Sequence, residues 1–261
     1  MSWSAEQYVA FEAERTRPAR DLLSAIPPGG VGVAIDIGCG PGNSTALLTA
    51  RFPASRIIGI DSSPDMIAAA RARLPEVRFE VADVRAWARD VGASPEGAAL
   101  IFANAVLQWV PGHDALFPAL CARLCMGGWL AVQVPDNLDE PAQVLMREIA
   151  DGGPWRRKLA DADRSRVRIE PPDRYYALLR ASCARVDVWR TTYYHALAGA
   201  DAIVEWFKGT GLLPFLAPLD PAERAGYLLR YARAIESAYP AAADGTVLLP
   251  FPRLFIVATR R

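Results

Sequence analysis

The feature that most constrains this chain is a glycine-rich turn between an apolar run and a helix-forming segment. Residues 31–37 are almost wholly apolar, which is typical of a strand buried on both faces of a parallel sheet. Gly38, Gly40 and Gly42 follow at once, and we interpret residues 44–51 as a helix. Glycines at alternate positions let the backbone pass very close to a ligand. A strand, a bare turn and a helix in this order predict an α/β sheet with a ligand at the turn.

Strand and helix patterns alternate along the rest of the first half. Further short apolar runs predict buried strands over residues 56–60, 77–81, 99–103 and 129–134. Between them we expect helices, among them 63–73, with Ser63 as its N-cap and Pro64 at its first position, and 114–124. This alternation predicts βαβ units with right-handed crossovers.

The second half has a different pattern. Residues 183–195 alternate as a half-exposed strand does, and residues 254–258 form a last apolar run. Residues 139–182 and 200–239 are expected to be mainly helical. The predicted fold class is therefore α/β, a Rossmann-like sheet of seven mostly parallel strands with helical cap insertions.

The domain prediction is a single domain over residues 1–261. Tyr8, Phe11 and Arg15 recur at helical spacing before a Pro-Pro-Gly-Gly break, so residues 1–26 are predicted to form an N-terminal helical lid over a bound ligand. The alternative is that this helix only packs on the sheet. The predicted helical cap segments are about 139–182 and 196–250.

The composition excludes several classes of function. Lys plus Arg and Asp plus Glu both number 29, and this balance argues against a nucleic-acid partner. No apolar stretch reaches the ~18–20 residues that span a bilayer, and the N-terminus does not have the pattern of a signal peptide, so we expect a cytoplasmic protein without a membrane partner. Two histidines and four cysteines without a CxxC pair predict no metal site.

The spacing of the turn indicates which ligand it would hold. Nicotinamide enzymes use GxGxxG, whereas Asn43 stands here where the third glycine would be, leaving GxGxG. That variant is typical of S-adenosylmethionine sites, where the loop cradles an amino-acid carboxylate. Asp61, 19 residues after Gly42, is placed to accept hydrogen bonds from two ribose hydroxyls. A helix-capping role for Asp61 is the alternative, but Ser63 already offers that cap.

Two further strand ends carry polar residues. The Asp83 carboxylate and the Val84 amide suit the edge of an adenine ring, although Asp83 could be an ordinary turn residue. Asn104 ends the fourth strand, where ligands bind in such sheets. Gln108 and Trp109 could line the methionine part of the ligand, with a core position as the alternative for Trp109.

These motifs resemble those of class I S-adenosylmethionine-dependent methyltransferases. The superfamily signals are residues 36–42, 60–64 and 82–83. A narrower resemblance, to the trans-aconitate 2-methyltransferases, runs over nearly the whole chain. The segments that carry it are 43–48, 100–105, 107–109, 131–133, 135–137, 144–148, 188–195 and 251–259. The Arg-rich stretch 151–170 does not match.

The resemblance implies a Rossmann-like methyltransferase fold and an O-methyltransferase that esterifies one carboxylate of trans-aconitate or a similar polycarboxylic acid. The cofactor would be S-adenosyl-L-methionine and its product S-adenosyl-L-homocysteine. An acceptor carboxylate with a pKa near ~4 is already ionised, so no catalytic side chain is predicted beyond those that position it. The predicted cofactor-binding residues are Asp36, Gly38, Cys39, Gly40, Gly42, Asp61, Ser62, Met66, Asp83, Val84, Asn104 and Trp109.

A trianionic acceptor also needs cations and hydroxyl donors around it. The predicted acceptor-binding residues are Arg15, Gln108, Arg147, Arg190, Tyr193, Tyr194, His195 and Arg253. Strand alternation places Arg190 and Tyr194 on one face and Tyr193 and His195 on the other. They cannot all face one pocket without a bend in the strand.

Three other functions remain open at this point. One is a small-molecule methyltransferase that modifies a carbon or oxygen of another acceptor, which would need the same cofactor residues. The second is an NAD(P)-dependent oxidoreductase, against which the GxGxG spacing and the lack of a YxxxK motif argue. The third is a non-catalytic module that only binds the cofactor.

Overall fold

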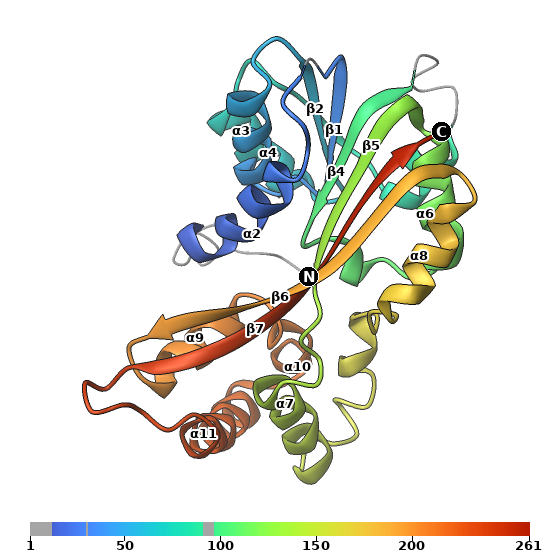
Figure 1. The fold of residues 1–261 in the computed structure, drawn as a ribbon. Coiled ribbons are helices and arrows are strands. Elements are labelled where there is room, and N and C mark those ends of the chain that lie inside the picture. The colour runs from blue at the N-terminus through green and yellow to red at the C-terminus, as the bar shows by residue number, and fades with distance from the viewer. Residues whose placement is uncertain (1–11, 30, 91–96) are drawn as a thin grey trace. The chain divides into compact units, whose positions relative to one another are not determined.

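The structure is a computed structural model that describes residues 12–29, 31–90 and 97–261 (Figure 1). These residues divide into two compact units. The sheet unit comprises residues 12–135, 169–191 and 254–261, and the helical unit comprises residues 136–168 and 192–253. We predicted one domain with cap segments, whereas the chain crosses between two units several times.

The sheet has seven strands in the order β3-β2-β1-β4-β5-β7-β6 (Figure 1). The strand pairs β3–β2, β2–β1, β1–β4 and β4–β5 are parallel. Chain order reverses between β1 and β4, and open α/β sheets bind ligands outside the strand ends at such a switch point. The strands are β1 Val33–Ile37, β2 Arg56–Asp61, β3 Arg78–Val81, β4 Ala98–Asn104, β5 Leu124–Pro135, β6 Cys183–Leu197 and β7 Val247–Arg260.

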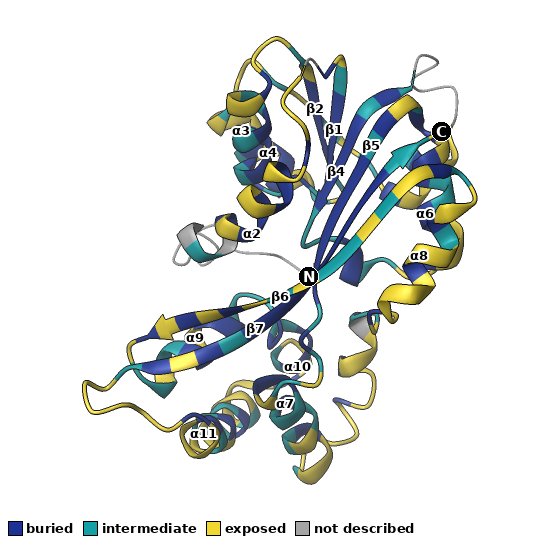
Figure 2. Cartoon of the chain, in the orientation of Figure 1, coloured by how far each residue is buried: buried dark blue, intermediate teal, exposed yellow. Residues whose placement is uncertain are grey.

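The predicted fold class is confirmed, because the central strands are apolar and buried on both faces (Figure 2). Ala34 in β1, Leu100 in β4 and Val132 in β5 are all fully buried. The sheet unit contains the helices α2 Glu12–Ser24, α3 Asn43–Arg51, α4 Pro64–Arg73, α5 Val84–Arg89, α6 His113–Ala122, α8 Pro172–Arg180 and the 3-10 helix η2 Leu107–Trp109.

Two strands are longer than their sequence patterns predicted. β5 begins at Leu124, five residues before the predicted start at Trp129. A Cβ on Gly128 would lie 2.8 Å from the carbonyl oxygen of Ala98, so the strand needs glycine at this β-bulge. β7 begins at Val247, seven residues before the last apolar run at 254–258, and it includes Pro250 and Pro252.

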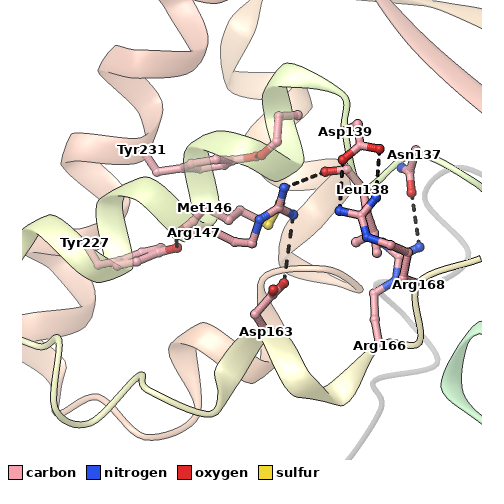
Figure 3. A network of polar contacts seen from close by, with 11 residues as sticks. Asn137, Leu138, Asp139, Met146, Arg147, Asp163, Arg166, Arg168, Tyr227 and Tyr231 are labelled. Atoms are coloured by element: carbon pink, nitrogen blue, oxygen red, sulfur yellow. Dashed lines mark hydrogen bonds and ion pairs between the residues drawn. The ribbon is translucent and has the colours of Figure 1, made fainter. Parts of the chain in front are cut away.

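The helical unit has an aromatic core of its own. It is built from α7 Pro141–Gly152, η3 Ala162–Ser165, α9 Ala200–Lys208, α10 Leu213–Leu216 and α11 Pro221–Ala238. The buried Tyr227 and Tyr231 hydroxyls of α11 donate to the carbonyl oxygens of Met146 and Ala142 at 2.8 and 3.0 Å (Figure 3). These bonds tie α11 to α7 and so hold the side chains of α7 in place.

The predicted cap segment 139–182 is divided between the two units. Its last part, α8, buries Tyr175 and Leu179 in the core of the sheet unit. The Tyr175 hydroxyl lies 2.7 Å from Nδ1 of His113 in α6. Helical propensity predicted this helix, but only tertiary packing assigned it to the sheet.

The predicted lid can be followed only in part. Tyr8 and Phe11 lie outside the described residues, as does the side chain of Arg15. Leu22 and Ile26, in and just after α2, are buried in the sheet unit. Whether residues 1–26 act as a lid or only pack on the sheet therefore stays a prediction. Among the helices that the structure describes, none combines the length and apolarity needed to cross a membrane.

Candidate functional site

The glycine turn after β1 is held against β2. The amides of Gly38 and Cys39 donate to the carbonyl oxygen of Ile60 at 2.8 and 3.1 Å. Gly38, Gly40 and Gly42 have φ values of +64°, +53° and +91°, a region that side chains disfavour. A Cβ on Gly38 would lie 2.3 Å from Cγ2 of Val106, whereas a Cβ on Gly40 would meet no atom within 4 Å. The backbone at Gly40 therefore faces open space.

Asp61 joins this turn from the end of β2. Its Oδ2 accepts the amide of Gly40 at 3.0 Å, and its Oδ1 accepts the amide of Ser63 at 2.9 Å. Each carboxylate oxygen has a second lone-pair site, so the pair of oxygens can still accept two hydroxyl groups. Ser63 caps α4 by accepting the amide of Met66 at 3.4 Å, with Pro64 at the first position, as the sequence predicted.

Asp83 lies two residues after the end of β3, the strand next to β2. Val81 pairs with Asp61 in the β2–β3 register, which places the two strand ends side by side. Asp83 caps α5, because its Oδ1 accepts the amides of Arg85 and Ala86 at 2.9 and 3.0 Å. Partial desolvation opposes ionisation, but these two amides and the Arg85 charge lower the pKa of Asp83 overall. The cap does not use the amide of Val84, the group predicted to meet an adenine nitrogen.

The Asp36 side chain points into the protein interior and is not exposed to a ligand. Its side chain is 0% exposed, and its Oδ2 accepts the hydroxyls of Ser44 and Thr45 at 2.7 and 2.6 Å. Burial raises the pKa of Asp36 to about 7 against the opposing effect of these two hydrogen bonds. The carboxylate therefore braces the first turn of α3 against β1 from inside the sheet unit.

Three more predicted cofactor residues differ in exposure. The Cys39 side chain is buried in a small cluster with Ile67, Ala70 and Phe79, and this burial raises the pKa of its thiol. The Met66 side chain is also buried, whereas Ser62 is exposed beside Asp61. At Cys39, only the backbone belongs to the turn.

The residues at and just after the end of β4 combine an unusual backbone conformation with buried polar atoms. Ala105 has φ +55°, rare for a residue with a Cβ, and Nε2 of Gln108 donates to its carbonyl oxygen at 2.7 Å. Oδ1 of Asn104 and Oε1 of Gln108 are buried, and neither has a hydrogen-bond partner among the described residues. Buried acceptors of this kind call for a donor. Trp109 is half-buried in η2 next to them.

The groups around the glycine turn and the ends of β2 and β4 match the parts of a nucleoside ligand that carries an amino-acid tail. The turn leaves open backbone at Gly40, Asp61 can accept two hydroxyls, and the buried acceptors of Asn104 and Gln108 can receive an ammonium group. Gly40, Asp61 and Asn104 lie at or just after the ends of β1, β2 and β4, and Gln108 lies in η2, which follows β4. The residues fit S-adenosylmethionine. No group of three His, Cys, Asp or Glu side chains within the described ranges could hold a metal ion.

The predicted acceptor-binding residues on β6 lie on two opposite faces of the strand. Tyr193 and His195 are buried, whereas Arg190 and Tyr194 are exposed, Tyr194 by 63%. This alternation confirms the predicted division of the strand. In the helical unit the His195 ring stacks with that of Tyr193 at a centroid distance of 6.4 Å, and Arg253 near Tyr193 is 4% exposed. The Arg253 guanidinium carbon lies 4.6 Å from the centroid of the Phe251 ring and 6.0 Å from that of Tyr193.

A second group of basic residues surrounds the segment 137–139 (Figure 3). Nη2 of Arg147 donates to the carbonyl oxygen of Leu138 at 2.8 Å, and its Nη1 lies 3.9 Å from Oδ1 of Asp163. Nη2 of Arg166 donates to Oδ1 of Asn137 at 3.1 Å. Sequence reasoning singled out Arg147 but missed Arg166 and Asn137. The only signal was the Arg-rich composition of residues 151–170, which names no partner.

Comparison with known proteins identifies relatives along the whole chain. A family described as a methyltransferase domain matches residues 34–128. The trans-aconitate 2-methyltransferase of Rhizobium meliloti (strain 1021) is 55% identical over 260 residues, covering 100% of this chain and 99% of that protein. The protein of the same name from Rhodopseudomonas palustris (strain HaA2) is 52% identical over 258 residues, covering 99% of each.

Solved structures agree on the fold. The YcgJ protein from Bacillus subtilis superposes with a TM-score of 0.61 at 13% identity, covering 94% of this chain and 98% of that one. A phosphoethanolamine N-methyltransferase 2 from Haemonchus contortus, solved with S-adenosylhomocysteine, gives 0.55 at 16% identity, covering 94% and 52%. Because full-length relatives share 55% and 52% of its residues, the chain belongs to the trans-aconitate 2-methyltransferase family of class I methyltransferases.

Proposed function

We propose that this protein is an S-adenosylmethionine-dependent O-methyltransferase that esterifies one carboxylate of trans-aconitate or a similar small polycarboxylic acid. The products are the monomethyl ester and S-adenosylhomocysteine. The observation that carries the proposal is the junction of Gly40 and Asp61 at 3.0 Å, in a chain whose full-length relatives have this activity in their names. The balance of 29 cations and 29 acidic groups supports a small-molecule acceptor over a nucleic acid.

The sheet unit would hold the cofactor through groups at its strand ends. Asp61 binds the ribose hydroxyls, the backbone around Gly40 accommodates the amino-acid carboxylate, and Asn104 accepts from the ammonium group. Asp83, through the oxygen that does not cap α5, and the Val84 amide bind the adenine. S-adenosylmethionine, when bound, supplies a methyl group on a positively charged sulfur. Asp36 acts from behind by fixing α3, and Cys39 acts through its backbone.

The helical unit would supply the residues that bind the acceptor. Tyr193, His195 and Arg253 form one buried cluster, and Arg147 lies on α7. The acceptor carboxylate is ionised at neutral pH, so these residues need to orient it and exclude water, not deprotonate it. One carboxylate oxygen forms the new bond to the methyl carbon, the sulfur–carbon bond breaks, and its electron pair stays on sulfur.

A methyl-transfer assay over a panel of acids tests this function. We expect ester formation with tri- and dicarboxylic acids, fastest with trans-aconitate, and S-adenosylhomocysteine as co-product. Calorimetry should show micromolar binding of S-adenosylhomocysteine and no binding of NADH. Activity confined to amines or phenols would contradict the proposal, as would tight binding of NADH without binding of S-adenosylhomocysteine.

A further inference from the structure

A chain of buried hydrogen bonds in the sheet unit connects α8 to the turn that follows β4. The Tyr175 hydroxyl of α8 lies 2.7 Å from Nδ1 of His113, the first residue of α6. Nε2 of the same ring lies 3.0 Å from the carbonyl oxygen of Leu107 in η2. Leu107 and Tyr175 are 0% exposed and His113 is 5% exposed. His113 therefore joins α8 to the turn that carries Gln108 and Trp109.

The groups at the two ends of this chain decide where its protons lie. The Leu107 carbonyl oxygen can only accept, so Nε2 of His113 carries a hydrogen and donates it. The same oxygen accepts the amide of Val110 at 3.0 Å with its second lone pair. In the neutral ring Nδ1 is then an acceptor, and the Tyr175 hydroxyl donates to it. The amide of Glu170 donates in turn to the Tyr175 oxygen at 3.3 Å. All the bonds of the chain thus run in one direction, and such chains strengthen one another.

The turn that His113 holds packs directly on the glycine turn. Val106, next to Leu107, lies so close to Gly38 that a Cβ there would be 2.3 Å from Cγ2 of Val106. Ala105 has φ +55°, a conformation that a residue with a Cβ keeps only where its surroundings hold it. Because close-packed interiors transmit strain, a shift at Leu107 moves Val106 and with it the glycine turn. The same turn sets the position of Gln108, whose Nε2 donates to the Ala105 carbonyl oxygen at 2.7 Å.

Aromatic packing fixes the orientation of the His113 ring. Phe117, one helical turn later in α6, is 1% exposed and packs edge-on to His113 at a centroid distance of 5.3 Å. Its ring also lies 4.9 Å from that of Tyr175. The imidazole is therefore held by packing as well as by its two hydrogen bonds, and its Nε2 stays on the Leu107 carbonyl.

We infer that His113 is a positioning residue of the methyl-transfer site. By donating from Nε2 to Leu107 it holds the turn 105–109, and through Val106 the glycine turn, in the conformation that binds the cofactor. Tyr175 acts through His113, because its hydroxyl fixes which ring nitrogen carries the proton. This inference rests on the proposed function and assigns His113 no contact with the cofactor or the acceptor.

The first test locates the proton in the full-length wild-type protein. The chain has 2 histidines, so long-range nitrogen NMR of the imidazoles is simple to read, and the signals that His113→Gln removes belong to His113. In mildly alkaline buffer we expect a protonated Nε2 and an unprotonated Nδ1. An Nε2 without a proton would overturn the inference, because the ring would then have no donor for Leu107. This measurement does not depend on activity.

The second test separates the two hydrogen bonds of the ring. In His113→Gln the amide nitrogen lies as many bonds from Cα as Nε2 does, so a donor for Leu107 remains. In His113→Asn the amide takes the place of Nδ1, and that donor is lost. We expect His113→Asn to weaken S-adenosylhomocysteine about three- to tenfold in calorimetry, the range of one neutral hydrogen bond. Its kcat should fall by a similar factor with little change in KM for trans-aconitate, whereas His113→Gln should stay within about twofold of the wild type.

Adjacent tyrosines of α8 supply the controls. Tyr175→Phe removes the hydroxyl that fixes the ring and should lower kcat and cofactor affinity about two- to threefold, whereas Tyr176→Phe, at a side chain 48% exposed, should change neither. Equal losses of stability in urea for His113→Asn and His113→Gln, with kcat and cofactor affinity unchanged in both, would show a purely structural role and overturn the inference. If His113→Asn does not fold, Tyr175→Phe decides: wild-type kcat and affinity overturn the inference, and a loss at unchanged KM for the acceptor supports it. A wild-type protein that binds no S-adenosylhomocysteine would refute the proposed function itself.

Discussion

The ends of β1, β2 and β3 in the sheet unit and the proposed acceptor-binding groups of the helical unit both have to bind a charged ligand, and they are built in different ways. At the strand ends, open backbone and two carboxylates form the proposed cofactor site, and each group lies within a few residues of a strand end. In the helical unit, the proposed acceptor-binding groups come from α7, β6 and β7, which are far apart in the chain. The first site depends on backbone conformation and the second on side-chain packing. We therefore expect the first to fail abruptly on substitution and the second to fail gradually.

The largest effect is expected at the glycine turn. Gly38→Ala places a Cβ 2.3 Å from Val106 at φ +64°, and overpacking with left-handed strain should lower the free energy of unfolding by roughly 2–5 kcal/mol. Gly40→Ala meets no atom and should lose only about 1–2 kcal/mol. Both should abolish binding of S-adenosylhomocysteine. Urea unfolding measures the stability of each variant, and calorimetry measures its binding of S-adenosylhomocysteine. Equal stability of the two variants would mean that Val106 does not constrain the turn.

The buried carboxylate of Asp36 gives the sheet unit a pH dependence. Its folded-state pKa, about 7, lies above its ordinary value of 3.8, so the folded protein holds the proton more tightly. The stability from this group is complete below its ordinary pKa and is lost as pH rises towards and past 7, by at most about 4 kcal/mol. The free energy of unfolding of the wild type should therefore fall relative to Asp36→Asn across that window. If the free energy of unfolding changes with pH in the same way in both proteins, the pKa of Asp36 is not raised.

A smaller effect is expected at the ribose contact. Asp61→Ala removes a charged acceptor and should weaken S-adenosylhomocysteine by about ten- to a hundredfold in calorimetry. Asp65→Ala, in the exposed first turn of α4, is the matched control and should change affinity less than about twofold. If Asp61→Ala binds as tightly as the control, Asp61 does not bind the ribose.

The smallest effect should lie on β6, where adjacent tyrosines face opposite ways. Tyr193→Phe removes a hydroxyl from the buried cluster and should raise KM for the acceptor up to about tenfold, the range of one neutral hydrogen bond. Tyr194→Phe, on the exposed face, should change nothing measurable. Equal effects in steady-state kinetics would indicate that the buried face of β6 does not bind the acceptor.

The residues whose position in the fold could be predicted from the sequence lie close to strand ends. Asp61 is the last residue of β2, and the parallel register then places it beside Val81, two residues before Asp83. The cap by Ser63 followed from local chemistry in the same way. Arg166 was missed because its partner, Asn137, is 29 positions away and no periodicity links the two.

The sequence by itself determined the parallel sheet, the glycine turn, the carboxylate at the end of β2 and the one just after β3, and the two faces of β6. These follow from backbone geometry and hydrophobic period, which act over a few residues. Only the tertiary structure decided that Asp36 turns inward, that α8 packs on the sheet unit, and that Arg166 meets Asn137 while Arg168 pairs with Asp139. Burial and side-chain pairing depend on residues far apart in the chain, and no local pattern records which of them meet.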